Sequence, residues 1–201
     1  MNGELKVKKT FSGFSGVVNT GKFSLFLVLD KNGSNVSLDQ LLLTCINYNH
    51  IIVKGVSDDE IFEQHVELSK LVKKVIDKNP NIQFELHTLG RIKPNGFTKI
   101  NNIKFIVNIE LKNTGRDYKE RVVDKSIKWF NEFGATFLFY INDKDDFDEL
   151  NLIINDFGIK KSSVYLAPYS LENNILSDTI EIAKTTGFNI TMDFSKALWD
   201  C

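Results

Sequence analysis

The feature that most constrains this fold is the alternation of short apolar, β-favouring runs with amphipathic segments of ten or more residues. The first apolar run, residues 23–29, lies between Gly21 and the turn-forming residues 30–33. A helix between two such strands implies a right-handed crossover, because parallel strands cannot be joined by a tight turn. The alternation therefore predicts an α/β fold with a mostly parallel sheet.

About six strands and four or five helices are expected in this pattern, which is too few for a complete eightfold barrel. An open partial barrel or an open parallel sheet fits instead. No linker rich in Gly, Pro or Ser divides the chain, so a single domain over residues 1–201 is predicted. The predicted strands are 23–29, 51–53, 82–86, 103–111, 135–141, 163–168 and 188–192, and the predicted helices are 37–47, 57–79, 120–133, 145–157 and 171–186.

The composition is that of a globular protein, with 42% hydrophobic and 25% charged residues. A net charge of −1 provides no field that would gather phosphates, so nucleic-acid binding is not indicated. The apolar runs are far shorter than the roughly 20 residues of a membrane-spanning helix, and the N-terminus lacks the apolar region of a secretory signal. These features predict a cytoplasmic protein.

Two cysteines, Cys45 and Cys201, are too few for a disulfide framework, a structural zinc site or a cysteine-ligated iron–sulfur cluster. Cys45 falls inside a predicted helix, where a small buried thiol is expected. The three histidines, His50, His65 and His87, show no metal-ligand spacing, so no metal site is predicted. A G-x-S-x-G motif is also absent, which leaves a nucleophilic triad without support.

In an open α/β sheet, ligands bind outside the carboxyl ends of the strands. His87 is predicted at this rim beside Glu85, as a ligand-facing residue or a partly buried packing residue. Glycines 13, 16 and 21 precede the first predicted strand, whereas a phosphate loop should follow a strand, so phosphate binding is not expected. The predicted rim comprises residues 30–34, 54–58, 87–91, 112–116, 142–144 and 167–170.

The C-terminal part carries a recognisable order of motifs. Val164-Tyr-Leu-Ala-Pro168 is followed by an amphipathic helix, then by Gly187-Phe-Asn-Ile-Thr191 and Lys196-Ala-Leu-Trp199. This order resembles the ending of the 7-carboxy-7-deazaguanine synthases, which are radical S-adenosylmethionine enzymes of the queuosine pathway. Ser195 stands where that family has a histidine. Looser similarities are found at residues 21–29, 85–90, 110–112 and 137–149.

Two departures from the family pattern concern its cofactors. The family's first strand leads into a loop with three cysteines that hold a [4Fe–4S] cluster, but here residues 30–37 read Asp-Lys-Asn-Gly-Ser-Asn-Val-Ser. Oxygen donors cannot replace soft thiolates at such a cluster. The family's Gly-Gly-Glu-Pro motif, which receives S-adenosylmethionine, reads Gly55-Val-Ser57-Asp58. The resemblance thus implies a degenerate radical-SAM-like partial (βα)6 barrel that binds no cofactor and no metal.

These observations predict a catalytically inactive relative, a pseudoenzyme, that acts as a binding, regulatory or structural partner in a protein assembly and can itself form a homo-oligomer. A bias to 22 lysines and 20 asparagines follows AT-rich coding, as in many phages and low-GC bacteria, and a phage-encoded protein would act in the host cytoplasm. The alternative is an enzyme or enzyme subunit of 7-deazaguanine metabolism whose partner supplies the cluster. An unrelated α/β binding domain stays open as a third reading. The candidate residual ligand rim comprises Glu85, His87, Lys112 and Lys196, and Trp199 is expected either to plug the core or to form a protein interface.

Overall fold

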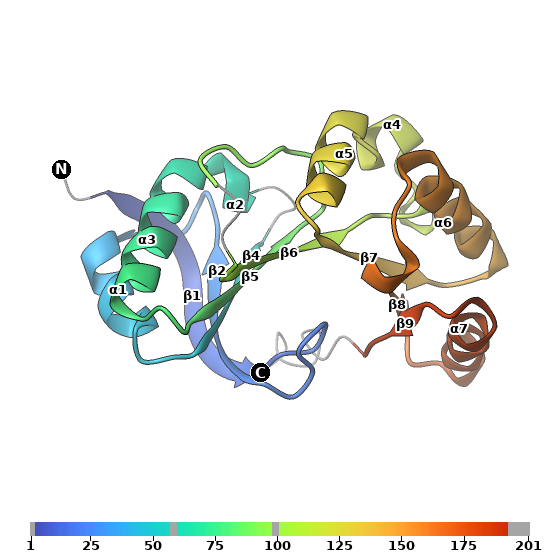
Figure 1. Cartoon of the computed structure of the whole chain (residues 1–201), viewed down its shortest axis with the longest axis horizontal. Helices are drawn as coiled ribbons and strands as arrows, with labels where there is room; N and C mark the ends of the chain where they lie inside the picture. The colour runs from blue at the N-terminus through green and yellow to red at the C-terminus, as the bar shows by residue number, and fades with distance from the viewer. Residues whose placement is uncertain (1–2, 57–59, 98–100, 193–201) are drawn as a thin grey trace. The chain divides into compact units, whose positions relative to one another are not determined.

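A computed structural model describes residues 3–56, 60–97 and 101–192 (Figure 1). The chain divides into two compact units. Unit 1 comprises residues 1–15, 21–88 and 92–105, and unit 2 comprises residues 16–20, 89–91 and 106–201. Strand β6 (Ile103–Asn108) begins in unit 1 and ends in unit 2. None of the described helices is long and apolar enough to cross a membrane.

Unit 1 is built on a mostly parallel sheet with an antiparallel edge. Its strand order is β3-β1-β2-β4-β5, followed by the first half of β6. β1 pairs antiparallel with both β2 and β3, whereas β2, β4 and β5 are parallel neighbours. The elements are β1 (Glu4–Phe14), β2 (Phe23–Leu29), β3 (Ser34–Ser37), α1 (Leu38–Cys45), β4 (His50–Gly55), α2 (Glu60–Glu63), α3 (His65–Lys78) and β5 (Gln83–Thr88).

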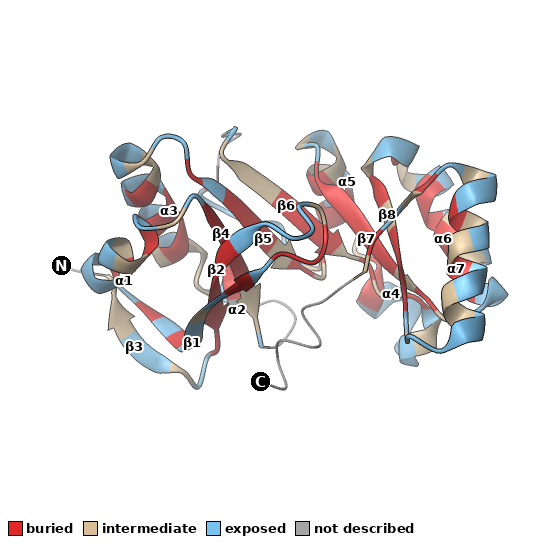
Figure 2. Cartoon of the chain, turned by 90° about the horizontal axis from the view of Figure 1, so that it is seen from below, coloured by how far each residue is buried: buried red, intermediate tan, exposed pale blue. Residues whose placement is uncertain are grey.

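The core of unit 1 contains strands with nearly every side chain buried. In β2 all six residues from Ser24 to Leu29 are buried, as the red colour along the central strands in Figure 2 shows. A strand buried on both faces reads as a continuous apolar run, which is why β2 carries no alternation. α1 and α3 lie side by side over the sheet (Figure 1), and α3 directs Leu68, Leu71 and Val75 into the core.

Unit 2 continues the parallel pattern with the second half of β6 followed by β7, β8 and β9 in that order. α6 packs against β7, while α7 packs against β8 and β9. Its core includes Val17, Ile106, Leu138 and Ala167. The elements are η1 (Lys112–Thr114), α4 (Tyr118–Arg121), α5 (Asp124–Glu132), β7 (Thr136–Ile141), α6 (Lys144–Phe157), η2 (Lys161–Ser163), β8 (Val164–Pro168), α7 (Asn173–Thr186) and β9 (Asn189–Ile190).

The mostly parallel α/β architecture predicted from the alternation is confirmed, and the sheet order has two ends, at β3 and β9. The predicted helix at 37–47 forms as α1, with the Ser37 hydroxyl accepting a hydrogen bond from the backbone of Gln40. The helix expected to end at Gly158 does so, and that glycine adopts the left-handed conformation. The described residues contain nine strands, because each of the seven predicted ranges includes a strand and β1 and β3 were not predicted.

Two predicted helices are each divided in the structure. The segment expected as one helix from 57 to 79 forms α2 and α3 with a break at Gln64. The Gln64 side chain accepts a hydrogen bond from the Lys6 backbone nitrogen and donates one to the Lys6 carbonyl oxygen in β1. The segment 120–133 likewise forms α4 and α5, because Val122 and Val123 take extended conformations. In the first case a tertiary contact competes with helix continuation.

Gly33 lies directly against the backbone of β1. A Cβ atom at this position would be 2.6 Å from both the carbonyl carbon and the carbonyl oxygen of Val7. Gly33→Ala is therefore expected to destabilise the protein by about 1–3 kcal/mol, as overpacking against a fixed backbone does. Chemical denaturation measures the effect, with Asn32→Ala in the same turn as the control. Equal stability of the two variants would contradict this close approach.

Candidate functional site

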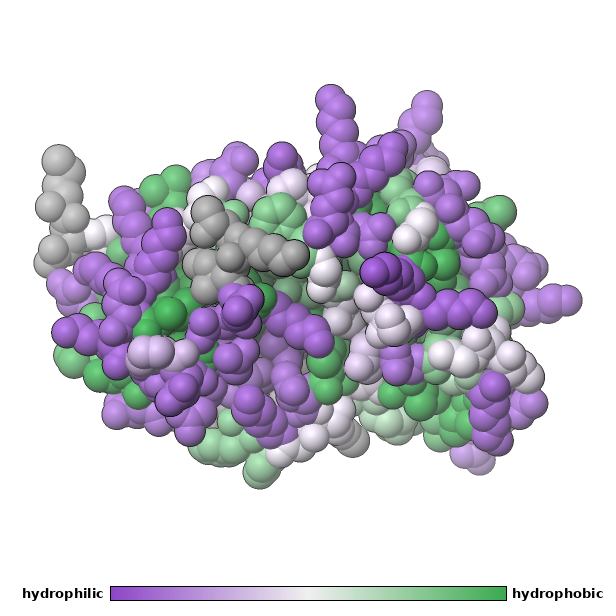
Figure 3. Space-filling model, in the orientation of Figure 1, coloured by the Kyte–Doolittle hydropathy of each residue, from purple (hydrophilic) through white to green (hydrophobic). Residues whose placement is uncertain are grey.

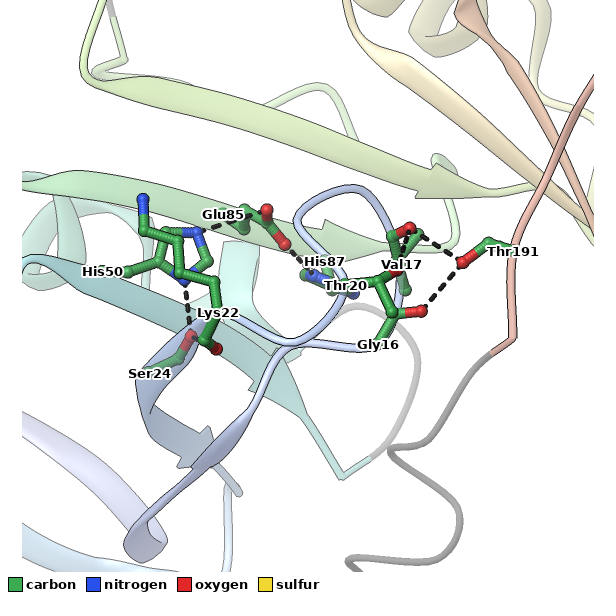
Figure 4. Close-up of polar contacts among 9 residues, drawn as sticks. All are labelled: Gly16, Val17, Thr20, Lys22, Ser24, His50, Glu85, His87 and Thr191. Atoms are coloured by element: carbon green, nitrogen blue, oxygen red, sulfur yellow. Dashed lines mark hydrogen bonds and ion pairs between the residues drawn. The ribbon is translucent and has the colours of Figure 1, made fainter.

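Glu85 is the centre of a buried polar chain in unit 1 (Figure 4). Its carboxylate lies between two imidazoles: Oε1 is 3.3 Å from His50 Nε2, and Oε2 is 3.2 Å from His87 Nε2. Glu85 and His50 are almost completely buried, whereas the His87 side chain is 13% exposed. β4 contributes His50, and β5 contributes the other two residues. His87 is thus the solvent-facing end of this chain.

The other end of the chain is a serine. The Oγ of Ser24, at the start of β2, lies 2.6 Å from His50 Nδ1 and donates to the backbone oxygen of Lys22 at 2.9 Å. Ser24, His50 and Glu85 thus form a serine, histidine and acid chain, but the ring nitrogens are interchanged relative to a catalytic triad, in which the serine contacts Nε2 and the acid contacts Nδ1. Ser24 and His50 are completely buried, so a substrate cannot reach the hydroxyl. These residues therefore form a structural hydrogen-bond network, and their geometry does not indicate acyl-transfer chemistry.

The two histidines determine the charge state of Glu85. Burial alone would raise the pKa of the Glu85 carboxyl, because it disfavours the charged form. The hydrogen bonds from His50 and His87, together with their charges, outweigh burial and hold that pKa well below its usual range. Glu85 is therefore a carboxylate at neutral pH. A carboxylate in this position fixes the orientation of the His87 ring.

The remaining site residues from the sequence analysis lie in different places. Gly55 is the last residue of β4. Lys112 is in unit 2, where its Nζ lies 2.9 Å from Asp145 Oδ2, and this pairing raises the pKa of the lysine. The structure thus brings Glu85 and His87 together, while Lys112 pairs with a helix carboxylate. Ser57, Asp58, Lys196 and Trp199 lie outside the described residues.

The segment after β2 forms a closed turn. The Gly33 nitrogen donates to the Asp30 carbonyl oxygen at 2.7 Å, and the Asn32 nitrogen donates to Asp30 Oδ1 at 2.8 Å. Cys45, the cysteine within the described part of the chain, is completely buried in α1, and burial raises its pKa to about 12. It is therefore a protonated thiol at neutral pH, as expected from its place in the helix. The described residues include no group of three or more His, Cys, Asp or Glu that could hold a metal.

A threonine contact in unit 2 was missed by sequence reasoning. The Thr191 hydroxyl lies 2.8 Å from the carbonyl oxygens of both Gly16 and Val17 and donates to them (Figure 4). Thr191 is the threonine of the Gly-Phe-x-x-Thr motif, and its side chain is buried. It therefore holds the segment that precedes β2. The contact spans about 175 positions of sequence, so no local pattern could have indicated it.

Comparison with known proteins finds no matching family model and no matching curated protein. Among solved structures, the chain is similar to QueE from Escherichia coli, a 7-carboxy-7-deazaguanine synthase. The TM-score is 0.66 and the sequence identity is 14%, with 94% of each chain covered. The similarity therefore extends over almost all of both chains, and the chain shares the fold of QueE.

Proposed function

We propose that this chain is a catalytically inactive relative of the 7-carboxy-7-deazaguanine synthases that acts by binding a protein partner. The closed turn after β2 is the observation that carries the proposal. A cluster with an open iron needs three thiolates at that place, but Asp30 uses its oxygens to close the turn over Gly33. Cys45 is buried and protonated, so it is not a thiolate ligand. The residues present do not fit the cluster.

The loop after β4 supports the same proposal. The first glycine of the family's cofactor loop is retained as Gly55, but the next residue is Val56, which is 51% exposed. Its backbone nitrogen donates to the Leu29 carbonyl oxygen at 2.9 Å. A β-branched side chain thus occupies a position where the family's second glycine allows close approach of a ligand.

Anaerobic reconstitution with iron and sulfide is expected to leave the protein colourless. The measurements are the absorption spectrum, bound iron and acid-labile sulfide, with an intact 7-carboxy-7-deazaguanine synthase as the positive control. Cys45→Ala should give the same result as the natural chain, because this thiol takes no part. A stoichiometric brown species with bound sulfide would overturn the pseudoenzyme proposal.

S-adenosylmethionine is expected to bind weakly or not at all, since both the open iron and the second glycine of the loop are missing. Isothermal titration calorimetry at about millimolar ligand measures this affinity directly. A Kd of about 1 mM corresponds to a binding free energy of about −4 kcal/mol. Micromolar affinity would instead support the enzymatic alternative.

An exposed aromatic surface in unit 1 supports the binding role. Phe14 and Phe23 are 56% and 57% exposed, and their rings meet edge to face with centroids 5.8 Å apart. Phe23 also stacks on Tyr48, beside a groove of about 920 Å³. Exposed aromatic rings are typical anchors of protein interfaces. Hydrophilic side chains cover most of the face drawn in Figure 3, with hydrophobic ones exposed in small separate areas.

Affinity purification from the native source tests the partner directly. The natural chain should retain a specific partner, and the double variant Phe14→Ser, Phe23→Ser should lose it while its stability stays close to that of the natural chain. The Trp199→Ala variant examines the interface that the sequence places at the C-terminus. Retention of no specific partner by the natural chain would contradict the binding role. The phage origin and host cytoplasm belong to this proposal and rest on the AT-rich composition.

The enzymatic alternative has one favourable observation, the His87 imidazole oriented by the buried Glu85. An imidazole held by a carboxylate is the usual arrangement of a general acid or base. The His87 imidazole would then serve a non-radical step in 7-deazaguanine nucleotide metabolism. It could equally serve in a subunit of an enzyme whose partner supplies the cluster. Turnover of a 7-deazaguanine precursor that is lost in His87→Gln would favour this alternative.

A further inference from the structure

We propose that a small pocket in unit 2 binds a guanidinium group. The pocket has a volume of about 240 Å³ and lies where β6, β7 and β8 end. All of its lining residues belong to unit 2, whereas the residues of the aromatic surface and of the Glu85 chain belong to unit 1. The lining residues are Asn108, Ile109, Glu110, Asn113, Thr114, Tyr140 and Tyr169.

Two polar residues of the pocket, Asn113 and Thr114, donate their hydrogen bonds to other groups of the protein. The Asn113 amide nitrogen donates to the Tyr140 carbonyl oxygen at 3.1 Å and to Asp146 Oδ2 at 2.7 Å. The Thr114 hydroxyl donates its single proton to the Leu111 carbonyl oxygen at 2.9 Å. What Asn113 and Thr114 have left for a ligand is oxygen lone pairs. Both residues therefore favour a ligand that carries several N–H donors.

Asn108 adds a third acceptor. Its Oδ1 is buried and has no hydrogen-bond partner among the residues that the structure describes. Leaving a buried acceptor without a donor is unfavourable, so such an atom in a pocket wall is uncommon and calls for an explanation. A donor bound in the pocket beside Asn108 would supply the missing hydrogen bond. This atom is the strongest reason to infer a donor-rich ligand.

The charges and rings narrow the ligand to a planar cation. Glu110 contributes a carboxylate, which also pairs with Arg91, and no lysine or arginine is among the lining residues. Unit 2 as a whole has 12 Lys and Arg against 16 Asp and Glu, so its field favours a cation. Tyr140 and Tyr169 also line the pocket, and a guanidinium stacks on aromatic rings better than an ammonium does.

The volume sets the size of the ligand. Pockets for drug-sized molecules measure about 300–1,000 Å³, so 240 Å³ suits a small cation or the end of an arginine side chain. Both sources present the same guanidinium to the same acceptors. Methylguanidinium and N-acetyl-arginine methylamide are therefore the probes, the first for a free small molecule and the second for an arginine of a partner.

Two-dimensional ¹H–¹⁵N NMR of the full chain tests the proposal without a substitution. Methylguanidinium should shift the amide signals of residues 108–114, and N-acetyl-arginine methylamide should shift the same signals more strongly if the source is an arginine. Tetramethylammonium, a cation without donors, should bind at least about tenfold more weakly. Shifts located elsewhere, no shifts with either guanidinium probe, or equal binding of tetramethylammonium would overturn the proposal.

Asn108→Leu separates binding from folding. It removes an acceptor that lacks a partner, so the stability of the protein should stay the same or rise. Methylguanidinium binding should fall at least about tenfold in this variant. Asn155→Leu, on the exposed side of α6, is the matched control and should bind normally. Tyr169→Leu, at a 44% exposed position, should also weaken binding, and unchanged affinity in both pocket variants would contradict the assignment.

Discussion

Glu85→Ala is expected to lower the free energy of unfolding by about 3–5 kcal/mol, the usual cost of removing one partner of a buried ionic network. The substitution removes the carboxylate that lies beside His50 Nε2 and His87 Nε2. Glu85→Gln keeps the volume and should cost less. Chemical denaturation measures the effect, and Gln83→Ala, exposed on the same strand, is the control. If Glu85→Ala loses as little stability as the control variant, the hydrogen-bonded network around Glu85 contributes little to the stability of the protein.

The same carboxylate makes stability depend on pH. The pKa of Glu85 is lower in the folded protein than in the unfolded chain, so its contribution is complete above the unfolded value of about 4.3. The contribution is lost as the pH falls from there toward the folded pKa. The stability difference between the natural chain and Glu85→Gln should therefore shrink as the pH falls below about 4.3. A difference that grows as the pH falls would have the wrong sign.

Arg121→Met is expected to have an effect of similar size in unit 2, again about 3–5 kcal/mol. The Arg121 guanidinium is 4% exposed and donates at 2.8 Å to three oxygens, the backbone oxygens of Arg116 and Glu110 and the Oε1 of Glu149. Methionine fills the volume but leaves all three acceptors without this donor. Glu149 also accepts from the Lys112 nitrogen, so the loss should extend to η1.

Arg121→Lys distinguishes charge from geometry. A lysine keeps the positive charge but cannot direct three donors from one plane, so it should recover only part of the stability. Lys119→Met, exposed on the same helix, is the control and should cost little. Full recovery in Arg121→Lys would show that charge alone matters, whereas a negligible loss in Arg121→Met would contradict the role of the network.

Much of the architecture could be predicted because its signals are local. The apolar run of β2, the serine cap of α1 and the glycine that ends α6 each depend on neighbouring residues. β1 was missed because its first half alternates only at Leu5 and Val7 and its second half is largely exposed. This strand is specified by its pairing with β2 and β3, which a reading of neighbouring positions does not detect.

The candidate site likewise contains one contact that the sequence predicts and others that depend on how the strands pair. The sequence places Glu85 and His87 on one strand two residues apart, so their contact follows from the strand period. Ser24 and His50 come from two other strands, and only the register of β2, β4 and β5 brings them to Glu85. The absence of cysteines from residues 30–37 is a property of the sequence, because no fold can change the ligand types that a segment carries.

The sequence by itself determined the alternation of strands and helices, the helix ends and the lack of cysteines at residues 30–37, since these depend on residue type and local spacing. Only the tertiary structure decided that Gln64 divides a helix, that Thr191 holds residues 16 and 17, and that the Asn108 acceptor is buried without a partner. Each of these depends on groups far apart in the chain, and their energies arise only when folding removes water and brings them within hydrogen-bonding distance.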